Sequence, residues 1–564
     1  MNGTREIFFN DVTLRDGEQA PGNKMKPDEK IRIAKQLVTL GINGIEAGFP
    51  AASPNEFRSV AAIAEQVGPM RLDRAFGSSP HPRISGLAHL KRDAIAAVLK
   101  AVRPAPHRGI HTFISTSSAQ MVKFERMIRQ RGGDPDSLHD FIDRVVLPDI
   151  EEEFAYIRSK DPDTVIQFSL EDWTRTDETA SYHVILHAVR NGASIINLPD
   201  TVGIGIPRLI HEQVRRVRRW LDENGFGHVR ISWHGHNDTG QGVASAMEAL
   251  YAGAEQFETT ILGIGERAGN YAFEGMLAAI DANMGIHERF VGRPIRDTLV
   301  RSEVMRTAKL VSGTIGAPIP REHPIVGENA FAHESGIHQD GVEKGRKKGR
   351  RDVYEILDPT RYGAVSKLIL GKHSGWSGMK AFLEERQLVF RHSDGKRFSA
   401  ALSRAADNRR KGLSDEEVLR NAYYPTVVDI TGGPLVTGIT VKRSPDPLKT
   451  VIITCNDGST IESTATDVRE GAVNALVVGL ERLMPGVDVR DFDVHNKPGE
   501  ESSAATAVGT VTIRNGHELT MQAEALDTEQ AGLQAVIRAF NALWAYERYA
   551  AMSHDEDASQ AAGA

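Results

Sequence analysis

Short apolar runs alternate with longer amphipathic stretches along the chain from Glu6 to about Asp281. The runs have the length of buried strands, whereas the stretches between them repeat apolar side chains with the period of a helix. The predicted strands cover residues 6–14, 44–49, 70–77, 109–115, 164–170, 193–199, 229–236 and 256–262. Eight strands that alternate with helices favour an α/β fold with a closed parallel (β/α)8 barrel, a TIM barrel, over an open doubly wound sheet.

The pattern changes twice after the barrel. A polar, mainly helical region comes first, and alternating β-type runs follow it. Residues 451–483 and 511–543 share one plan: a strand, an Asn-Asp-Gly or Asn-Gly turn, a second strand, and a helix with Asp467 or Asp527 near its start. The duplication indicates a module that binds a small effector, pairs with a second copy, or is purely structural. The predicted parts are a barrel at 1–285, helical subdomains at 286–422, an α+β domain of two βα repeats at 423–550, and a disordered tail at 551–564.

Composition narrows the class of protein. The chain of 564 residues is 40% hydrophobic and 25% charged, with a formal net charge of -7, and its length calls for several folding units. The acidic balance gives no electrostatic reason to expect nucleic acid or an anionic membrane as a partner. The sequence shows no signal-peptide pattern and no apolar run of membrane-spanning length, and its one cysteine, Cys455, excludes an internal disulfide. We therefore expect a cytoplasmic enzyme.

The most informative polar pattern is the pair His234 and His236, at the end of the seventh predicted strand. Side chains at i and i+2 of a strand point to the same side. Asp16 follows the first strand, and strands one, seven and eight are neighbours in a closed barrel. Two neutral imidazoles and one carboxylate suit a catalytic divalent ion with open coordination positions. A His-x-His pair alone is more often an ordinary pair, so the prediction depends on the residues around it.

Other polar residues also lie where predicted strands end, which is the end at which TIM-barrel enzymes hold their active sites. These are Arg15, Glu46, Ser169, Glu171, Asn197, Asp200 and Thr201, with His111 in the fourth strand and the segment GIGERAGN after the eighth. The sequence thus predicts a metal site at the carboxyl-terminal mouth of the barrel.

A series of motifs, in order along the chain, resembles the 2-isopropylmalate synthase family. They are TLRDGEQAPG, IEAGFPAASPNEF, HTFISTSS, FSLEDWTRT, INLPDTVG, HGHNDTGQGVASAMEALYAGA, GIGERAGN, HESGIHQDG and LILGKHSG. They extend to about residue 375, and the C-terminal repeats resemble the regulatory domain of the family. The resemblance implies condensation of acetyl-CoA with a 2-oxo acid, followed by thioester hydrolysis, to give a 2-substituted malate and CoA.

The resemblance also implies a role for each residue of the metal site. Asp16, His234 and His236 would hold the ion, which is zinc, manganese or magnesium, and Asn270 would complete or border the site. The ion would chelate the 2-oxo acid as a Lewis acid. Arg15 would stabilise negative charge on the ketone oxygen.

A base must remove a proton from the methyl group of acetyl-CoA, and the resemblance makes Glu171 and His338 the candidates, the latter from the helical region. Thr201 would bind the substrate carboxylate or else cap a helix. Tyr362 either approaches the mouth or packs elsewhere. The other predicted substrate contacts are His111, Ser169, Asn197 and Phe76, and the predicted contacts with CoA are Gly265, Glu266 and Asn270.

Two departures from the family pattern leave the substrate and the regulation open. Phe76, in the predicted third strand, lies near the position where the family controls pocket size. We expect 2-oxoisovalerate, with phenylpyruvate, pyruvate and 2-oxoglutarate as alternatives. The segment AEALDTEQAG lacks the glycine-rich and Ser-Thr-Asp pattern of leucine-binding members, so we do not expect inhibition by leucine.

Rival functions fit the residues less well. An acyl-CoA lyase of this barrel type would carry a cysteine in a glycine-rich barrel loop, but Cys455 lies far outside the barrel. A biotin-dependent carboxyltransferase would use a lysine at the metal, and the matching segments contain none. A non-catalytic scaffold would not need an intact Asp-His-His set. From the resemblance we also expect a homodimer.

Overall fold

The structure is a computed structural model of the chain, and it forms two compact units. We call residues 1–331 with 356–366 the barrel unit, and residues 332–355 with 367–564 the C-terminal unit. The structure describes residues 3–562 except 75–78, 334, 336–337, 339–340, 343, 346–347, 351–352, 365–366, 369, 372–373, 408–411, 443–447, 467–470, 497–506, 516 and 526–527.

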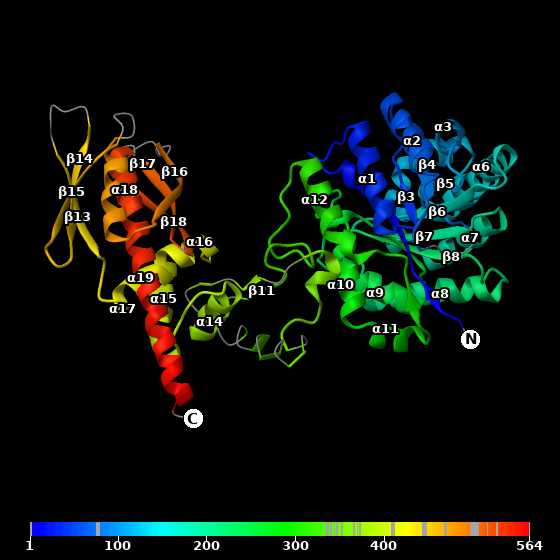
Figure 1. The fold of residues 1–564 in the computed structure, drawn as a ribbon. Coiled ribbons are helices and arrows are strands. Elements are labelled where there is room, and N and C mark those ends of the chain that lie inside the picture. Colours follow the sequence, from blue (N-terminus) through cyan, green and yellow to red (C-terminus); the bar gives the residue numbers. More distant parts are fainter. Residues whose placement is uncertain are drawn as a thin grey trace. The chain divides into compact units, whose positions relative to one another are not determined.

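The barrel unit contains a closed barrel of eight parallel strands, which confirms the predicted fold (Figure 1). In order around the ring, the strands are β2 (Phe8–Asp11), β3 (Gly44–Glu46), β4 (Arg83–His89), β5 (Arg108–Ser115), β6 (Val165–Glu171), β7 (Ile195–Asp200), β8 (Arg230–Gly235) and β9 (Gln256–Thr259). The ring closes where β2 pairs with β9, in a register that places Phe8 opposite Gln256. Strands β2, β8 and β9 are therefore neighbours, as the metal-site prediction requires.

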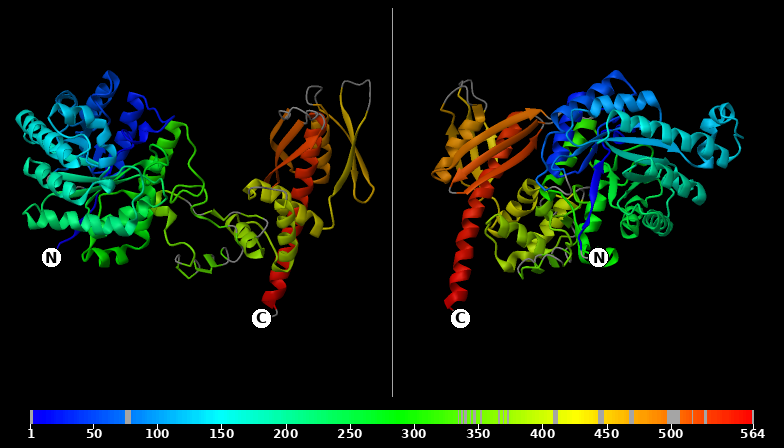
Figure 2. Two further views of the ribbon diagram at one scale, coloured as in Figure 1. Left: turned by 180° about the vertical axis from the view of Figure 1, so that it is seen from behind. Right: turned by 90° about the vertical axis from the view of Figure 1, so that its right-hand side faces the viewer.

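Helices surround the strands in the views of Figure 2. Those that lead from each barrel strand to the next, together with the helix after β9, are α1 (Pro27–Leu40), α2 (Pro54–Gln66), α3 (Arg92–Val102), α4 (Glu125–Gln130), α5 (Leu138–Phe141), α6 (Leu147–Lys160), α7 (Glu178–Arg190), α8 (Pro207–Glu223), α9 (Gly242–Ala252) and α10 (Phe273–Ala282). Helix α2 starts as its sequence predicts, because Ser53 Oγ accepts a hydrogen bond from the Glu56 amide and Pro54 occupies the first helical position.

The third barrel strand is not where the sequence placed it. The prediction was residues 70–77, but residues 70–74 lie outside any strand and the strand is β4, at Arg83–His89. Residues 75–78, with Phe76, lie outside the described residues. The sequence RISGLAH was missed because Ser85 and Gly86 interrupt its apolar run, although every residue up to Ala88 is buried between β3 and β5. Tertiary packing, and not side-chain hydrophobicity, selects this strand.

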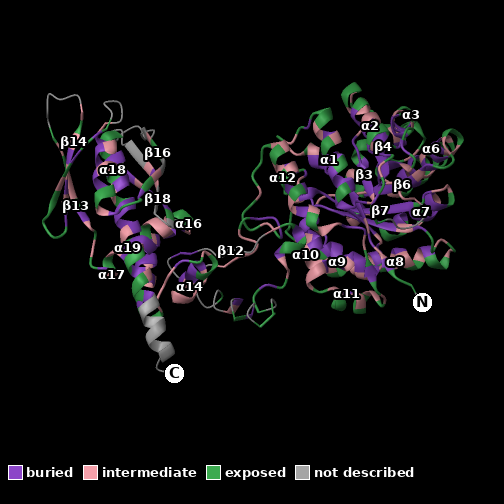
Figure 3. Cartoon of the chain, in the orientation of Figure 1, coloured by how far each residue is buried: buried purple, intermediate pink, exposed green. Residues whose placement is uncertain are grey.

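Further elements complete the barrel unit. The chain continues through α11 (Met284–Val291) and α12 (Val304–Ile315), and strand β1 (Arg5–Glu6) pairs with β10 (Ile295–Arg296). The short helical turn Pro359–Tyr362 also belongs to this unit. Figure 3 shows the barrel strands mostly as buried residues, and one continuous hydrophobic core links them with the surrounding helices.

The C-terminal unit has its own hydrophobic core. It contains a short pair of strands, helices and two antiparallel three-stranded sheets. The elements are β11 (Ala332–His333), β12 (Lys367–Leu368), α14 (Trp376–Glu385), α15 (Gly395–Ala406), α16 (Asp415–Val418), α17 (Tyr424–Ile430), β13 (Val436–Val441), β14 (Thr450–Cys455), β15 (Thr460–Thr464), α18 (Gly471–Leu483), β16 (Asp488–Asn496), β17 (Ala507–Asn515), β18 (His517–Ala525) and α19 (Thr528–Ala562).

Each predicted repeat contains one strand more than the sequence suggested, since β13 precedes the first and β16 the second. Asp467 and Asp527 lie outside the described residues. Helix α19 continues to Ala562, so residues 551–562 are helical and not disordered as predicted. The polar composition of this tail hid the helix, because alanine-rich polar segments satisfy helix propensity without a clear apolar stripe. Within the described residues, no helix is both long and apolar enough to cross a membrane.

Candidate active site

A cavity of about 390 Å³ opens at the carboxyl ends of the barrel strands. Its lining combines the polar residues that the sequence placed there with an apolar wall. It consists of Arg15, Asp16, Gln19, Phe49, Leu87, His89, His111, Phe113, Ser169, Glu171, Asn197, Pro199, Thr201, His234, His236, Glu258 and Glu266. The fold thus collects at one mouth residues of strands β4 to β9 and of the segments that follow β2 and β3.

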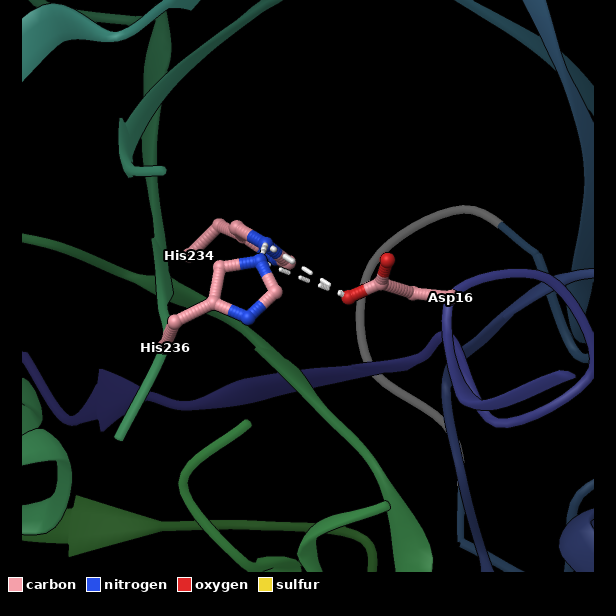
Figure 4. A group of neighbouring side chains, drawn as sticks. All are labelled: Asp16, His234 and His236. Carbon is pink, nitrogen blue, oxygen red and sulfur yellow. Dashed lines mark hydrogen bonds and ion pairs between the residues drawn. The ribbon is translucent and has the colours of Figure 1, made fainter. Parts of the chain in front are cut away.

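Asp16, His234 and His236 converge on one point, as Figure 4 shows. The Nε2 atoms of His234 and His236 are 3.4 Å apart, and they lie 3.7 and 3.9 Å from Asp16 Oδ2. Ligand atoms about 2.1 Å from one tetrahedral metal ion are separated by roughly 3.4 Å. The spacing and the donor types therefore fit a divalent ion.

The protonation of these groups also suits ligation. Burial and the neighbouring His234 lower the pKa of His236 to about 4, so its imidazole is neutral at pH 7. Burial opposes ionisation of Asp16, but Arg15 and the two histidines hold its pKa below the usual value. For His234, Glu258 and Asp16 outweigh the effect of burial and raise the pKa. One carboxylate and one neutral imidazole are ready as ligands, and a cation would displace the proton from the other imidazole.

Glu258, on β9, is the main site residue that the sequence analysis missed. Its carboxylate is fully buried, and Oε2 lies 3.2 Å from Nδ1 of His234. Oε1 accepts hydrogen bonds from Gln167 Nε2 at 2.5 Å and Asn10 Nδ2 at 3.2 Å, and Oε2 accepts one from Asn197 Nδ2 at 3.2 Å. A carboxylate behind a ligand imidazole fixes the ring and its tautomer. The available signal was a charged residue in the interior of the predicted strand QFETTIL.

Arg15 lies beside this group. Its Nη1 is 2.9 Å from Asp16 Oδ1, and its Nη2 donates to Glu46 Oε2 at 3.2 Å. These carboxylates outweigh burial and raise the pKa of Arg15, which stays charged. A fixed guanidinium at the rim of a metal site is placed to stabilise negative charge on a bound substrate.

Asn270 borders the metal group. Its Nδ2 donates to Asp16 Oδ2 at 2.7 Å and to the carbonyl of Ile264, and its buried Oδ1 makes no hydrogen bond to a described residue. Gly265 is necessary for this arrangement, because a Cβ there would lie 2.4 Å from Asn270 Nδ2. The turn is anchored by Arg267, which pairs with Asp238. Of the predicted CoA contacts, Glu266 lines the cavity and Gly265 is buried beneath it.

A hydrogen-bonded row covers the cavity floor next to the metal group. His111 Nδ1 donates to Glu46 Oε1 at 3.1 Å, its Nε2 lies 2.6 Å from Ser169 Oγ, and Asn197 Nδ2 donates to the same hydroxyl at 2.8 Å. The Oδ1 atom of Asn197 is buried and has no hydrogen-bond partner among the described residues. This row is therefore ordered before substrate binds.

Glu171 and Thr201 lie at the cavity rim. Glu171 accepts a hydrogen bond from Ser115 Oγ and lies 3.3 Å from Lys123 Nζ. Thr201 Oγ1 accepts a hydrogen bond from the amide of Asp172 at 2.9 Å, so its hydroxyl proton is free to point at a ligand. Asp200, by contrast, binds the amides of Ile204 and Gly205 and organises the loop.

Two predicted residues do not line this cavity within the barrel unit. Tyr362 is completely buried in the barrel unit, where its hydroxyl donates to Asp281 Oδ2 at 2.7 Å, so it packs and does not line the cavity. His338 belongs to the C-terminal unit, where its exposed ring lies 4.4 Å from the ring of Tyr354. A role for His338 stays a prediction.

The apolar wall was also missed by the sequence analysis. The ring of His89 contacts those of Phe49 and Phe113, with centroid distances of 5.2 and 4.8 Å, and Leu87 lines the cavity with them. Leu87 and His89 lie on β4, the strand that the sequence misplaced, and no local pattern marks them. This wall is the apolar part of the cavity lining.

The fold and the site together define a class: metal-dependent (β/α)8-barrel enzymes that bind a small acid at the carboxyl-terminal mouth. In agreement, residues 6–311 match the HMGL-like family, and residues 325–410 match the homocitrate synthase post-HMGL domain-like family. The chain belongs to the 2-isopropylmalate synthase family, as its motifs indicated.

The relatives match over nearly their whole length. The 2-isopropylmalate synthase of Synechococcus sp. (strain CC9605) is 37% identical over 573 positions, covering 98% of this chain and 97% of that protein. That of Prochlorococcus marinus (strain MIT 9313) is 37% identical over 559 positions, covering 96% and 94%. The solved hydroxymethylglutaryl-CoA lyase of Pseudomonas aeruginosa is 19% identical, covers 57% of this chain and 96% of its own, and has a TM-score of 0.41.

Proposed function

We propose that the protein condenses acetyl-CoA with 2-oxoisovalerate and hydrolyses the resulting thioester to give 2-isopropylmalate and CoA. The convergence of Asp16, His234 and His236 beside Arg15 carries this proposal. The comparisons support this proposal, because relatives named 2-isopropylmalate synthase match almost the entire chain.

The residues at the mouth account for each part of the reaction. Asp16, His234 and His236 would hold a divalent ion, which would supply Lewis-acid polarisation of the 2-oxo acid. Arg15 stabilises the negative charge that develops on the ketone oxygen. Thr201 and Asn197 orient the substrate carboxylate.

The carbon–carbon bond forms after a proton leaves the methyl group of acetyl-CoA. Glu171 or His338 accepts that proton, the methyl carbon attacks the ketone carbon, and the ketone oxygen is protonated to a hydroxyl. Water then cleaves the thioester, which releases CoA as a thiol and leaves a second carboxylate. Gly265, Glu266 and Asn270 border the position that we assign to CoA.

We expect the apolar wall to contact the side chain of the 2-oxo acid. Leu87 and the rings of Phe49 and Phe113 suit the isopropyl group of 2-oxoisovalerate. The aromatic contacts of His89 with Phe49 and Phe113 favour phenylpyruvate as the second candidate, because an aryl side chain gains from edge and offset contacts with such rings.

The test is CoA release, followed with a thiol reagent, across a panel of 2-oxo acids with a divalent metal present. Highest kcat/KM with 2-oxoisovalerate supports the proposal, and highest kcat/KM with phenylpyruvate supports the second candidate. Absence of CoA release with every acid would contradict the condensing function itself. Comparing Zn²⁺, Mn²⁺ and Mg²⁺ after chelator treatment identifies the ion that restores turnover.

His234→Ala tests the metal site directly. We expect turnover to fall by at least about a hundredfold and bound metal to fall below one equivalent. His183→Ala, which removes an exposed histidine on α7, is the matched control. It should leave turnover and the amount of bound metal unchanged. Unchanged turnover in His234→Ala would rule out the proposed mechanism.

We also propose that the protein is a homodimer, on the basis of the family resemblance alone. Light scattering on the eluting protein measures its mass directly. A mass of one chain across the concentration range would refute this proposal.

A further inference from the structure

A second cavity, of about 290 Å³, lies at the opposite, amino-terminal end of the barrel. Residues at the beginnings of the strands form it, including Phe8 of β2, Gly44 of β3 and Arg83 of β4. The lining contains two arginines, three histidines and no Asp or Glu among the described residues. Its polar members are Asn43, Ser79, His81, Arg83, His107, Ser194, His228, Arg230 and Gln256.

Arg83 is buried there and forms no direct ion pair with a described residue, although the carboxylates of Glu258 and Glu46, farther inside the barrel, favour its charged form. The side chain of Arg83 donates three hydrogen bonds, and all of them come from Nη2. The acceptors are Oδ1 of Asn10 at 3.1 Å, Oε1 of Gln167 at 3.3 Å and Oε1 of Gln256 at 3.0 Å. The Nε and Nη1 atoms of Arg83 donate to none of the described residues. Burying a guanidinium whose only hydrogen-bond partners are neutral amides costs free energy, and an anion bound beside it would offset that cost. Burial lowers the pKa of Arg83 to about 9, in line with that cost.

Arg230, on β8, brings a second cation to the same cavity. Its guanidinium lies 3.5 Å from the centroid of the Phe8 ring, and it forms no hydrogen bond or ion pair with a described residue. Stacking on an aromatic face fixes the plane of the guanidinium and leaves its N–H groups available. Two arginines with unused donors thus face one enclosed space.

The histidines add acceptors to these donors. His81 Nδ1 lies 2.9 Å from the carbonyl of Met70, and His107 Nδ1 lies 3.3 Å from the carbonyl of His81. A carbonyl oxygen only accepts, so each Nδ1 carries a proton. Burial and the nearby Arg83 lower the pKa of His107 to about 4, so its ring is neutral at pH 7 and its Nε2 is an acceptor. Hydrogen phosphate has acceptor oxygens for guanidinium groups and also an O–H donor, which a simple carboxylate lacks at neutral pH.

We propose that this cavity is a binding site for a phosphate group, either inorganic phosphate or the phosphate end of a small monoester. Arg83 and Arg230 bind the phosphate oxygens through charge-assisted hydrogen bonds, and the lining histidines and serines complete the contacts. The site lies at the other end of the barrel from the metal group and does not depend on the proposed reaction.

The experiment is calorimetric titration of inorganic phosphate into the full-length protein, in a buffer free of other phosphate and at constant ionic strength set by chloride. We expect saturable binding, and we expect Arg230→Gln to weaken it by at least about tenfold, since a charge-assisted bond is lost. Arg103→Gln removes the same charge from the exposed end of α3 and is the matched control, with unchanged affinity expected. Because Arg230 is only partly buried, this variant keeps the test valid even if Arg83→Gln fails to fold.

A parallel titration with glycerol 3-phosphate separates the two sources of the group. If this ester binds with comparable affinity, the ligand of the site is a phosphomonoester. If only inorganic phosphate binds, the ligand is the free anion. Absence of saturable binding of either probe, or equal affinity in the wild type and Arg230→Gln, would overturn the proposal.

Discussion

Glu258 connects the metal ligands with the interior of the barrel. The amides of Asn10 and Gln167 each accept from Arg83 and donate to Glu258, whose other oxygen lies 3.2 Å from His234 Nδ1. The orientation of one ligand imidazole is therefore set by a buried polar network that extends along the barrel interior.

Glu258→Gln tests this connection at the scale of one residue. The variant keeps the size of the side chain but removes the charge that faces His234, so we expect metal affinity to fall by roughly ten- to a hundredfold. Competition with a chromogenic chelator measures it. Glu223→Gln, at an exposed position of α8, should leave metal affinity unchanged. Equal affinity in Glu258→Gln and the wild type would show that the carboxylate does not support the ligand.

At the scale of an element, the turn after β9 positions Asn270 only because Gly265 lacks a side chain. Gly265→Ala would place a Cβ 2.4 Å from Asn270 Nδ2, so Asn270 must leave Asp16. We expect turnover to fall by at least about tenfold, because a small displacement at a reacting centre is costly. Gly313→Ala, in α12 with open space at its Cβ, is the control and should raise helix stability slightly. Full activity of Gly265→Ala would contradict this role of the turn.

A second element-scale prediction concerns the segment 356–366, which belongs to the barrel unit although the chain around it does not. Tyr362 attaches it through a hydrogen bond to Asp281, which Arg301 also binds. Tyr362→Phe should lower the unfolding free energy of the barrel unit by about 1 kcal/mol. Its KM for both substrates should stay unchanged, and a large increase in KM would instead place Tyr362 near the substrate.

At the scale of the molecule, the amino-terminal cavity makes stability depend on pH. Burial, followed by Arg83, lowers the pKa of His107 to about 4, while an unfolded histidine titrates near 6.5. The unfolded chain therefore binds a proton between these values and the folded chain does not, so stability decreases as the pH falls from about 6.5 to 4. The loss attributable to this group by pH 4 is about 3 kcal/mol.

His107→Gln should remove that part of the pH dependence. Hydrogen exchange in β4 and β5, compared at pH 7 and pH 5, reports the stability of the barrel strands. The difference between the two pH values should be smaller in His107→Gln than in the wild type, and His183→Gln should behave as the wild type. The same difference in all three proteins would contradict the assignment to His107.

The sequence determined the barrel, seven of its strands and the cluster of Asp16, His234 and His236, because these leave local signals. Parallel strands buried on both faces appear as apolar runs, and the i, i+2 spacing of His234 and His236 fixes their common direction. Asp16 was recognised because barrel closure brings the first and last strands together.

Only the tertiary structure decided where β4 lies, that Glu258 lies beside His234, that Leu87 and His89 line the cavity, and that Tyr362 packs against Asp281. In the sequence Arg83 is an ordinary charged residue at the start of β4, but in the folded chain it is buried beside a cavity whose described lining contains no carboxylate. These features depend on which side chains meet across the barrel. Such contacts join residues far apart in the chain, so their free energy leaves no periodic pattern in the sequence.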